Sequence, residues 1–99
     1  MDVARGDAVA LARELVKIDS RNPDLVPGAP GEFAIARVLG EVLRAWGFSV
    51  EIVEVAQGRP NVIARVGGGR GRSLMLNGHL DVVGVEGMTH AAFGAEERD

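Results

Sequence analysis

The most informative stretch of this 99-residue chain reads Leu74-Met75-Leu76-Asn77-Gly78-His79-Leu80-Asp81-Val82-Val83. The run from Ser73 to Asn77, which includes the first part of this stretch, is continuously apolar at its centre, which is typical of a strand buried on both faces of a sheet. His79 and Asp81 follow at a spacing of two, so an extended backbone would direct both side chains to one side, just past the strand's carboxyl end. Ligands bind at that end in open α/β sheets. The stretch therefore predicts a central strand that leads into a polar site.

A second interpretation of the same stretch is a β-hairpin. Asn77-Gly78 between two apolar runs is a strong signal for a two-residue turn, whose arms would be Leu74–Leu76 and Leu80–Val83. His79 and Asp81 would then be ordinary polar residues on the returning strand. Spacing alone favours such a polar pair, because a His close to an Asp is more often found at a loop edge than in a metal site. Both interpretations remain open on the residues themselves.

The metal interpretation has a definite chemical basis. An imidazole is a common zinc ligand, and a nearby carboxylate can accept its other N–H, which fixes the tautomer and makes the ring a better donor to the metal. Cysteine is absent from the chain, which excludes a disulfide framework, thiolate ligands and a cysteine nucleophile. Any metal site must therefore use His, Asp or Glu.

Two helices are predicted upstream. Apolar residues recur at helical spacing from Asp7 to Ile18, and Asp7 can cap the N-terminus of that helix. A second helix is expected from roughly Glu32 to Trp46, and Gly47 suits the left-handed position that follows a helix. The connection between them, Asn22 to Gly31, holds three of the four prolines and is expected to be irregular.

Two strands are predicted after the helices. The pattern alternates from Phe48 to Val53, a turn is expected at Gln57 to Pro60, and a second strand at Asn61 to Val66. With the strand at Ser73 to Asn77, the order is helix, helix, strand, strand, strand. That order predicts a layered α/β protein.

Composition restricts the class of protein further. A hydrophobic fraction of 46% and a charged fraction of 25% are ordinary for one globular domain. The net charge of −3 argues against a nucleic-acid partner. No apolar run approaches the roughly 18 residues that span a bilayer, and the first residues do not form a signal peptide. We therefore expect a cytoplasmic protein with no nucleic-acid and no membrane partner.

A family resemblance favours the strand and the metal ligand over the hairpin. Leu76–Val83 resembles the first metal-ligand motif of the acetylornithine deacetylase, succinyl-diaminopimelate desuccinylase, aminoacylase and carboxypeptidase G family of zinc metallohydrolases. Leu15–Pro23 is similar to the family's opening helix and its Ser-x-Asn-Pro turn, and Gly47–Glu51 and Pro60–Ala64 are similar to its next strands. Thr89–Asp99 resembles the stretch that leads toward the second metal motif. The resemblance covers nearly the whole chain, in the right order.

The chain also departs from the family pattern. Met88 and Ala92 stand where the family usually has a Trp and a Pro, positions that touch no metal ligand. The family's Gly-Arg-Gly-x-x-Asp-Met-Lys motif, with the Asp that bridges two metals, would begin beyond Asp99. The paired glutamates that hold the general base would lie further on.

The resemblance implies that His79 is a zinc ligand and that Asp81 is the catalytic carboxylate that orients it. It implies a three-layer αβα catalytic domain like that of zinc exopeptidases, of which residues 1–99 would be the N-terminal portion, incomplete at its C-terminus. It further implies two Zn²⁺ (or Co²⁺) ions per site in the complete enzyme, a homodimer, and hydrolysis of an amide bond in N-acyl amino acids or small peptides. This chain alone is expected to be inactive.

A different class of function is the alternative. The chain would then be a non-catalytic α/β fragment or interaction module that keeps part of the fold. The substrate also stays open among acetylornithine, succinyl-diaminopimelate, folate-type glutamates and dipeptides, because the groups that select it would lie downstream. His90 is expected to be a surface loop residue.

Overall fold

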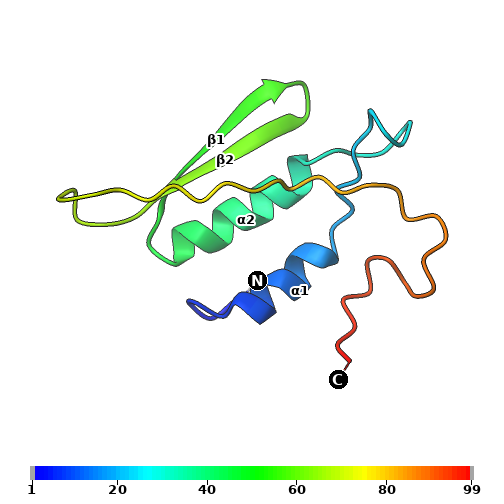
Figure 1. Cartoon of the computed structure of the whole chain (residues 1–99), viewed down its shortest axis with the longest axis horizontal. Coiled ribbons are helices and arrows are strands. Elements are labelled where there is room, and N and C mark those ends of the chain that lie inside the picture. The colour runs from blue at the N-terminus through cyan, green and yellow to red at the C-terminus, as the bar shows by residue number, and fades with distance from the viewer. Residues whose placement is uncertain (1, 99) are drawn as a thin grey trace.

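The computed structural model describes residues 2–98 and has a small α/β fold. Its elements are two helices and two strands, namely α1 (Ala8–Val16), α2 (Phe33–Ala45), β1 (Ser49–Ala56) and β2 (Arg59–Arg65). Figure 1 shows α2 lying between the β1–β2 hairpin on one side and α1 on the other. No helix in this described part of the chain has the length and apolar character needed to cross a membrane.

Both helices occur where the sequence predicts them, with ends that differ by one or two residues. The Asp7 side chain caps α1, because its Oδ1 accepts a hydrogen bond from the Ala10 N–H at 3.0 Å. Gly47 follows α2 with a φ of 96°, the left-handed conformation expected after a helix. Local sequence signals therefore determine where these helices begin and end.

The core is small and is centred on α2. Its buried apolar side chains are Ile35, Ala36 and Val42, all on that helix. Gly40 is also buried, and a Cβ placed on it would lie only 3.1 Å from Cδ1 of Ile52. The missing side chain thus lets α2 approach β1 closely. By contrast, α1 buries none of its residues despite its amphipathic pattern.

The two strands form an antiparallel hairpin, in register from Ser49 opposite Arg65 to Glu54 opposite Pro60. The predicted turn at Gln57 to Pro60 is shorter in the structure, where Arg59 and Pro60 already belong to β2. Gly58 takes a positive φ of 71°, and its N–H donates to the Glu54 side chain. A glycine in this conformation closes a tight turn, so strand pairing resumes at once.

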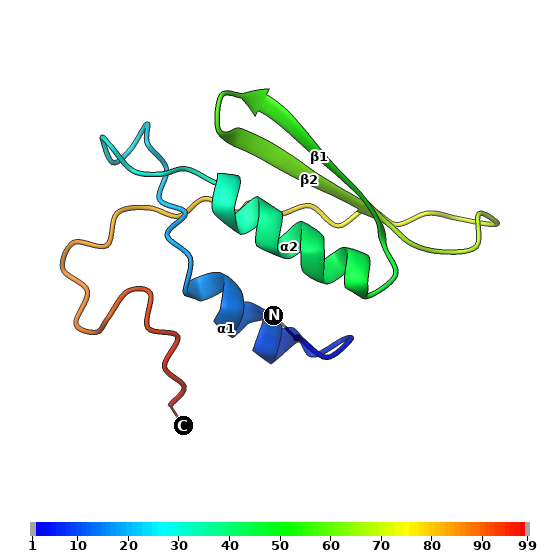
Figure 2. The same cartoon turned by 180° about the vertical axis from the view of Figure 1, so that it is seen from behind.

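The third strand predicted at Ser73 to Asn77 does not form within residues 2–98. The segment runs in front of α2 in Figure 1 and behind it in Figure 2, but it pairs with neither strand of the sheet. Leu74, Met75 and Leu76 are 84%, 88% and 87% exposed. A strand is stabilised by hydrogen bonds to a neighbouring strand, and within residues 2–98 this segment has no such neighbour. An apolar pattern without a pairing partner does not make a strand.

The competing hairpin is also absent from the part of the chain that the structure describes. Leu80–Val83 does not pair back on Leu74–Leu76; instead, Val82 forms an isolated parallel bridge with Arg21. The Asn22 N–H donates to the Val82 carbonyl at 2.9 Å, and the Val82 N–H donates to the Ser20 carbonyl at 3.1 Å. This bridge holds the end of the Leu74–Val83 stretch against the loop that follows α1.

Candidate functional site

His79 and Asp81 lie side by side, as their spacing predicts. Nδ1 of His79 is 2.9 Å from the main-chain carbonyl oxygen of Asp81 and 3.2 Å from Oδ1 of its carboxylate. Both oxygens are acceptors, so Nδ1 is the donor in these contacts, and a neutral ring makes them only as the Nδ1–H tautomer. Nε2 then keeps its free lone pair, and the imidazole is 83% exposed. The ring therefore offers one nitrogen to a ligand while Asp81 holds the other.

Each oxygen of the Asp81 carboxylate has its own partner. Oδ2 accepts a hydrogen bond from Nδ2 of Asn22 at 3.0 Å, and Oδ1 faces His79. The hydrogen bond from Asn22 is the main reason why the pKa of Asp81 lies below its ordinary value, opposed by partial desolvation and assisted by the nearby imidazole. Asp81 is therefore an anion at neutral pH.

A second carboxylate stands on the other side of the parallel bridge. Asp19 accepts two hydrogen bonds from the Arg21 guanidinium, at 2.9 Å from Nε and 2.8 Å from Nη2. This side-chain pairing lowers the pKa of Asp19, against a smaller opposing effect of desolvation. The Arg21 main-chain N–H also donates to Asp19. The turn that contacts Asp81 is thus held by local hydrogen bonds of its own.

Asn22 is the residue that sequence reasoning missed. Its expected role in a turn is confirmed, because its Oδ1 accepts the Asp24 N–H at 2.8 Å. Its contact with Asp81 joins residues 59 positions apart, which no local pattern can reveal. The one available signal was the Ser-x-Asn-Pro turn, which the family resemblance included without assigning it a contact.

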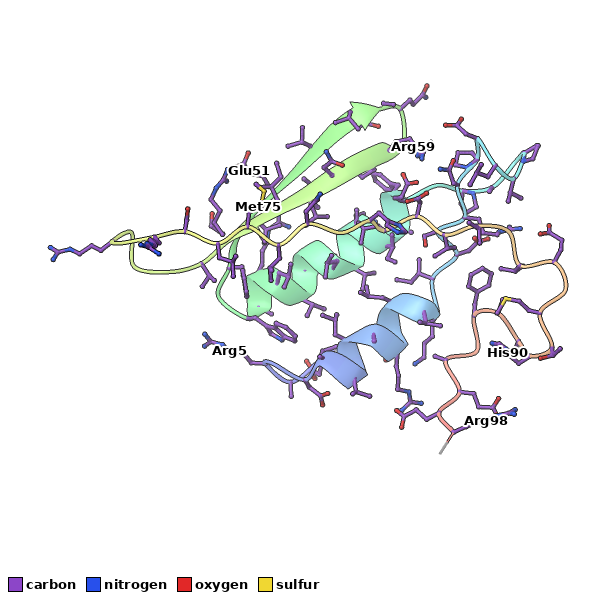
Figure 3. All side chains as sticks on the ribbon, viewed as in Figure 1. Arg5, Glu51, Arg59, Met75, His90 and Arg98 are labelled. Carbon is purple, nitrogen blue, oxygen red and sulfur yellow. The ribbon has the colours of Figure 1, made fainter. Side chains whose placement is uncertain are left out.

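The pair borders an open groove of about 850 Å³ between β2 and residues 75–81. Asn22, Glu32 and Arg59 also line this groove, so its polar groups come from four separate segments. Its volume falls in the range of small-molecule sites, roughly 300–1,000 Å³. His90 is exposed and lies on the C-terminal segment, away from the hairpin, in agreement with its expected surface position (Figure 3).

The donor set fits one position of a zinc site. An exposed imidazole whose second nitrogen is hydrogen-bonded to a carboxylate or carbonyl is the usual arrangement of a zinc-binding histidine. A catalytic zinc usually has three protein ligands, and residues 2–98 contain no cluster of three or more His, Asp or Glu side chains that could hold a metal. The described residues therefore supply a single ligand.

Comparison with known proteins gives one consistent result. No family model matches the chain, and no solved structure matches it significantly. The acetylornithine deacetylase of Vibrio campbellii is 51% identical over 47 residues, which is 43% of this chain and 12% of that protein. That of Vibrio atlanticus is 54% identical over 37 residues, 37% of this chain and 10% of the relative.

The acetylornithine deacetylase of Vibrio cholerae is 42% identical over 53 residues, which is 54% of this chain and 14% of that protein. The chain resembles the acetylornithine deacetylases. The expected resemblance is thereby confirmed for the acetylornithine deacetylases, over 37% to 54% of the chain rather than nearly all of it. The matched part is a small share of each acetylornithine deacetylase, between 10% and 14% of its length.

Proposed function

We propose that this chain is part of the catalytic domain of a metal-dependent hydrolase that cleaves the amide bond of an N-acyl amino acid or small peptide. The observation that carries the proposal is the His79–Asp81 pair, with Nδ1–H held by Asp81 and Nε2 exposed at the edge of a groove. The partial identity to acetylornithine deacetylases supports deacetylation as the reaction.

His79 would bind one Zn²⁺ or Co²⁺ ion through Nε2, in a site that takes two ions in the complete enzyme. A metal ion bound there would polarise the scissile carbonyl as a Lewis acid and make a water molecule more acidic. Asp81 would keep the imidazole in the Nδ1–H tautomer and hold the ring in one orientation. Its lowered pKa keeps the carboxylate ionised for that task.

The remaining parts of this proposal come from the family resemblance. Residues 1–99 would be the N-terminal portion of a three-layer αβα domain, and the other metal ligands and the general base would belong to further parts of a longer cytoplasmic, homodimeric protein. The exposed Leu74–Leu76 run would then be a central strand that gains its neighbours in the whole domain, which agrees with its apolar character.

The test is to express the complete open reading frame and to assay release of acetate from an N-acetyl amino acid together with metal content. His79→Ala should lose most of the activity and part of the bound metal. Asp81→Asn should weaken metal affinity or rate by about 10- to 100-fold. His90→Ala is the matched control and should behave as wild type. Wild-type metal content and turnover in the His79 variant would be incompatible with the proposal.

A non-catalytic α/β module is the second candidate. The observation that favours it is that the described residues supply only one metal ligand. The coding sequence after Asp99 separates the two candidates. A Gly-Arg-Gly-x-x-Asp motif in the same frame would support the enzyme, whereas a stop codon directly after Asp99 would leave this polypeptide without the ligands that hydrolysis needs.

A further inference from the structure

The side-chain amide of Asn22 is held at both of its ends. Its Oδ1 accepts the Asp24 N–H at 2.8 Å, and its Nδ2 donates to Oδ2 of Asp81 at 3.0 Å. Its main-chain N–H donates to the Val82 carbonyl, next to Asp81 in the chain. The Asp24 N–H can only donate, so it faces the amide oxygen of Asn22, and the Asp81 carboxylate accepts, so it faces the amide nitrogen. These two partners therefore set the orientation of the amide. Asn22 is thus rigidly placed against the His79–Asp81 pair.

This placement restricts how the Asp81 carboxylate can rotate. The terminal torsion of an Asp side chain has a broad energy profile, so the carboxylate alone would sample many orientations. The hydrogen bond from Asn22 holds Oδ2, which leaves Oδ1 at 3.2 Å from Nδ1 of His79. A free neutral imidazole can carry its hydrogen on either nitrogen, and an acceptor beside Nδ1 favours the Nδ1–H form.

We propose that Asn22 is a positioning residue, which anchors one oxygen of Asp81 so that the other keeps the His79 ring in the Nδ1–H tautomer. It acts through Asp81 and has no role as a metal ligand. The importance of this tautomer rests on the proposed function, since it is Nε2 that would bind the metal. The tautomer itself is a property of the metal-free chain and can be measured without activity.

Asn22→Asp is the decisive single variant. It keeps the oxygen that accepts the Asp24 N–H, so the turn is retained, but it removes the donor and places a second anion against Asp81. The measurement is the ratio of Nδ1–H to Nε2–H forms of His79, from imidazole ¹⁵N chemical shifts of the metal-free 99-residue chain, recorded for every variant in the pH range where these shifts no longer change with pH. The Asp81 carbonyl still accepts from Nδ1, so we expect the ratio to fall by only about three- to tenfold.

Two further variants separate positioning from general damage to the fold. Pro23→Ala changes the next residue of the same turn and leaves the amide in place, so its ratio should equal that of wild type. The double variant Asn22→Asp/Asp81→Asn exchanges donor and acceptor across the contact, which should bring the ratio back to within about twofold of wild type. Protection of the Val82 amide from hydrogen exchange reports whether the bridge to Ser20 is intact in each variant.

A wild-type ratio in Asn22→Asp with a protected Val82 amide would overturn the inference. So would a double variant that stays as low as the single variant. If the single variant loses protection at Val82, the double variant decides: a tautomer ratio that returns to that of wild type supports the inference, and one that stays low overturns it. Failure of the proposed function would appear elsewhere, as unchanged metal content in the His79→Ala variant of the complete protein, and would leave these tautomer ratios unaffected.

Discussion

Arg59 and Glu32 form an ion pair that joins the start of β2 to the residue before α2, with Nε of Arg59 2.5 Å from Oε2 of Glu32. Glu32 is only 7% exposed, and its Oε1 has no hydrogen-bond partner among the described residues. The hydrogen bond to Glu32 is the main cause that raises the pKa of Arg59, with a smaller effect from Asp24. Figure 3 shows Arg59 at the end of the hairpin nearest the start of α2. The ion pair thus connects the start of β2 to the N-terminal end of α2.

Removing Arg59 alone should destabilise the fold more than removing both charges. Arg59→Leu leaves the Glu32 carboxylate buried without its cation. Adding Glu32→Gln to that variant removes the unpaired negative charge. We therefore expect the single variant to unfold at a lower urea concentration than the double variant Arg59→Leu/Glu32→Gln. Urea titrations followed by circular dichroism measure both midpoints. A double variant that is no more stable than the single one would show that burial of Glu32 costs little.

A larger side chain at Gly40 should push α2 away from β1. Gly40→Val places branched atoms against Ile52, where even a Cβ lies at 3.1 Å, and we expect a loss of about 1–3 kcal/mol in the free energy of unfolding. Ala34→Val is the control, because Ala34 is exposed on the same helix and its substitution tests helix propensity alone. Chemical denaturation compares the two. Equal losses would mean that the close approach at Gly40 contributes nothing.

The pH dependence of stability should carry a contribution from Asp19. Because its pKa is lowered in the folded chain, chiefly by the Arg21 side chain, the stabilisation is complete well above the unfolded value near 3.9. It is lost as pH falls through the lower folded pKa. Solvent screening of this partly exposed pair limits the effect to less than about 1 kcal/mol. Asp19→Asn should flatten the stability profile below about pH 4, measured by urea titration at several pH values, and an unchanged profile would contradict this expectation.

The exposed Leu74–Leu76 run should make the 99-residue chain associate. Three adjacent large apolar side chains that are 84–88% exposed form a surface that favours contact with another molecule. We expect the sedimentation coefficient to rise with protein concentration, and the rise to diminish in Leu74→Ser/Leu76→Ser. Val55→Ser is the control, since Val55 is an exposed apolar residue of β1, 65% accessible, outside this run. A concentration-independent monomer for the unmodified chain would contradict this expectation.

The 99-residue chain should bind zinc only weakly and should hydrolyse nothing. One imidazole with a carboxylate behind it supplies one ligand, and a catalytic zinc usually requires three. Calorimetric titration with Zn²⁺ should give no binding at micromolar concentrations, and an assay with an N-acetyl amino acid should give the rate of the buffer blank. Tight binding or turnover would reveal ligands that the described residues do not show.

The elements that the sequence predicts correctly are those specified by local patterns. The helices are specified by residues close in sequence: the apolar period of α2, the N-cap at Asp7 and the glycine at position 47. The β1–β2 hairpin likewise pairs two strands that are adjacent in the chain. The strand predicted at Ser73 to Asn77 does not form within residues 2–98, because a strand needs a neighbouring strand for its main-chain hydrogen bonds. An apolar run does not show whether such a neighbour exists. In the candidate site, the proximity of His79 and Asp81 follows from their spacing, whereas the contribution of Asn22 depends on a distant part of the chain.

The bridge between Arg21 and Val82 also bears on the order in which the chain folds. It closes a loop that contains α2 and the whole hairpin, and the entropy of closing a loop rises with its length. Helix and hairpin formation bring together residues that are close in sequence and are faster. We therefore expect the segment with His79 and Asp81 to dock after the helices and the hairpin have formed, and its amides to exchange early, because few main-chain hydrogen bonds hold it. The contact between Asn22 and Asp81 thus depends on closure of this long loop, whereas the contact between His79 and Asp81, two residues apart, does not.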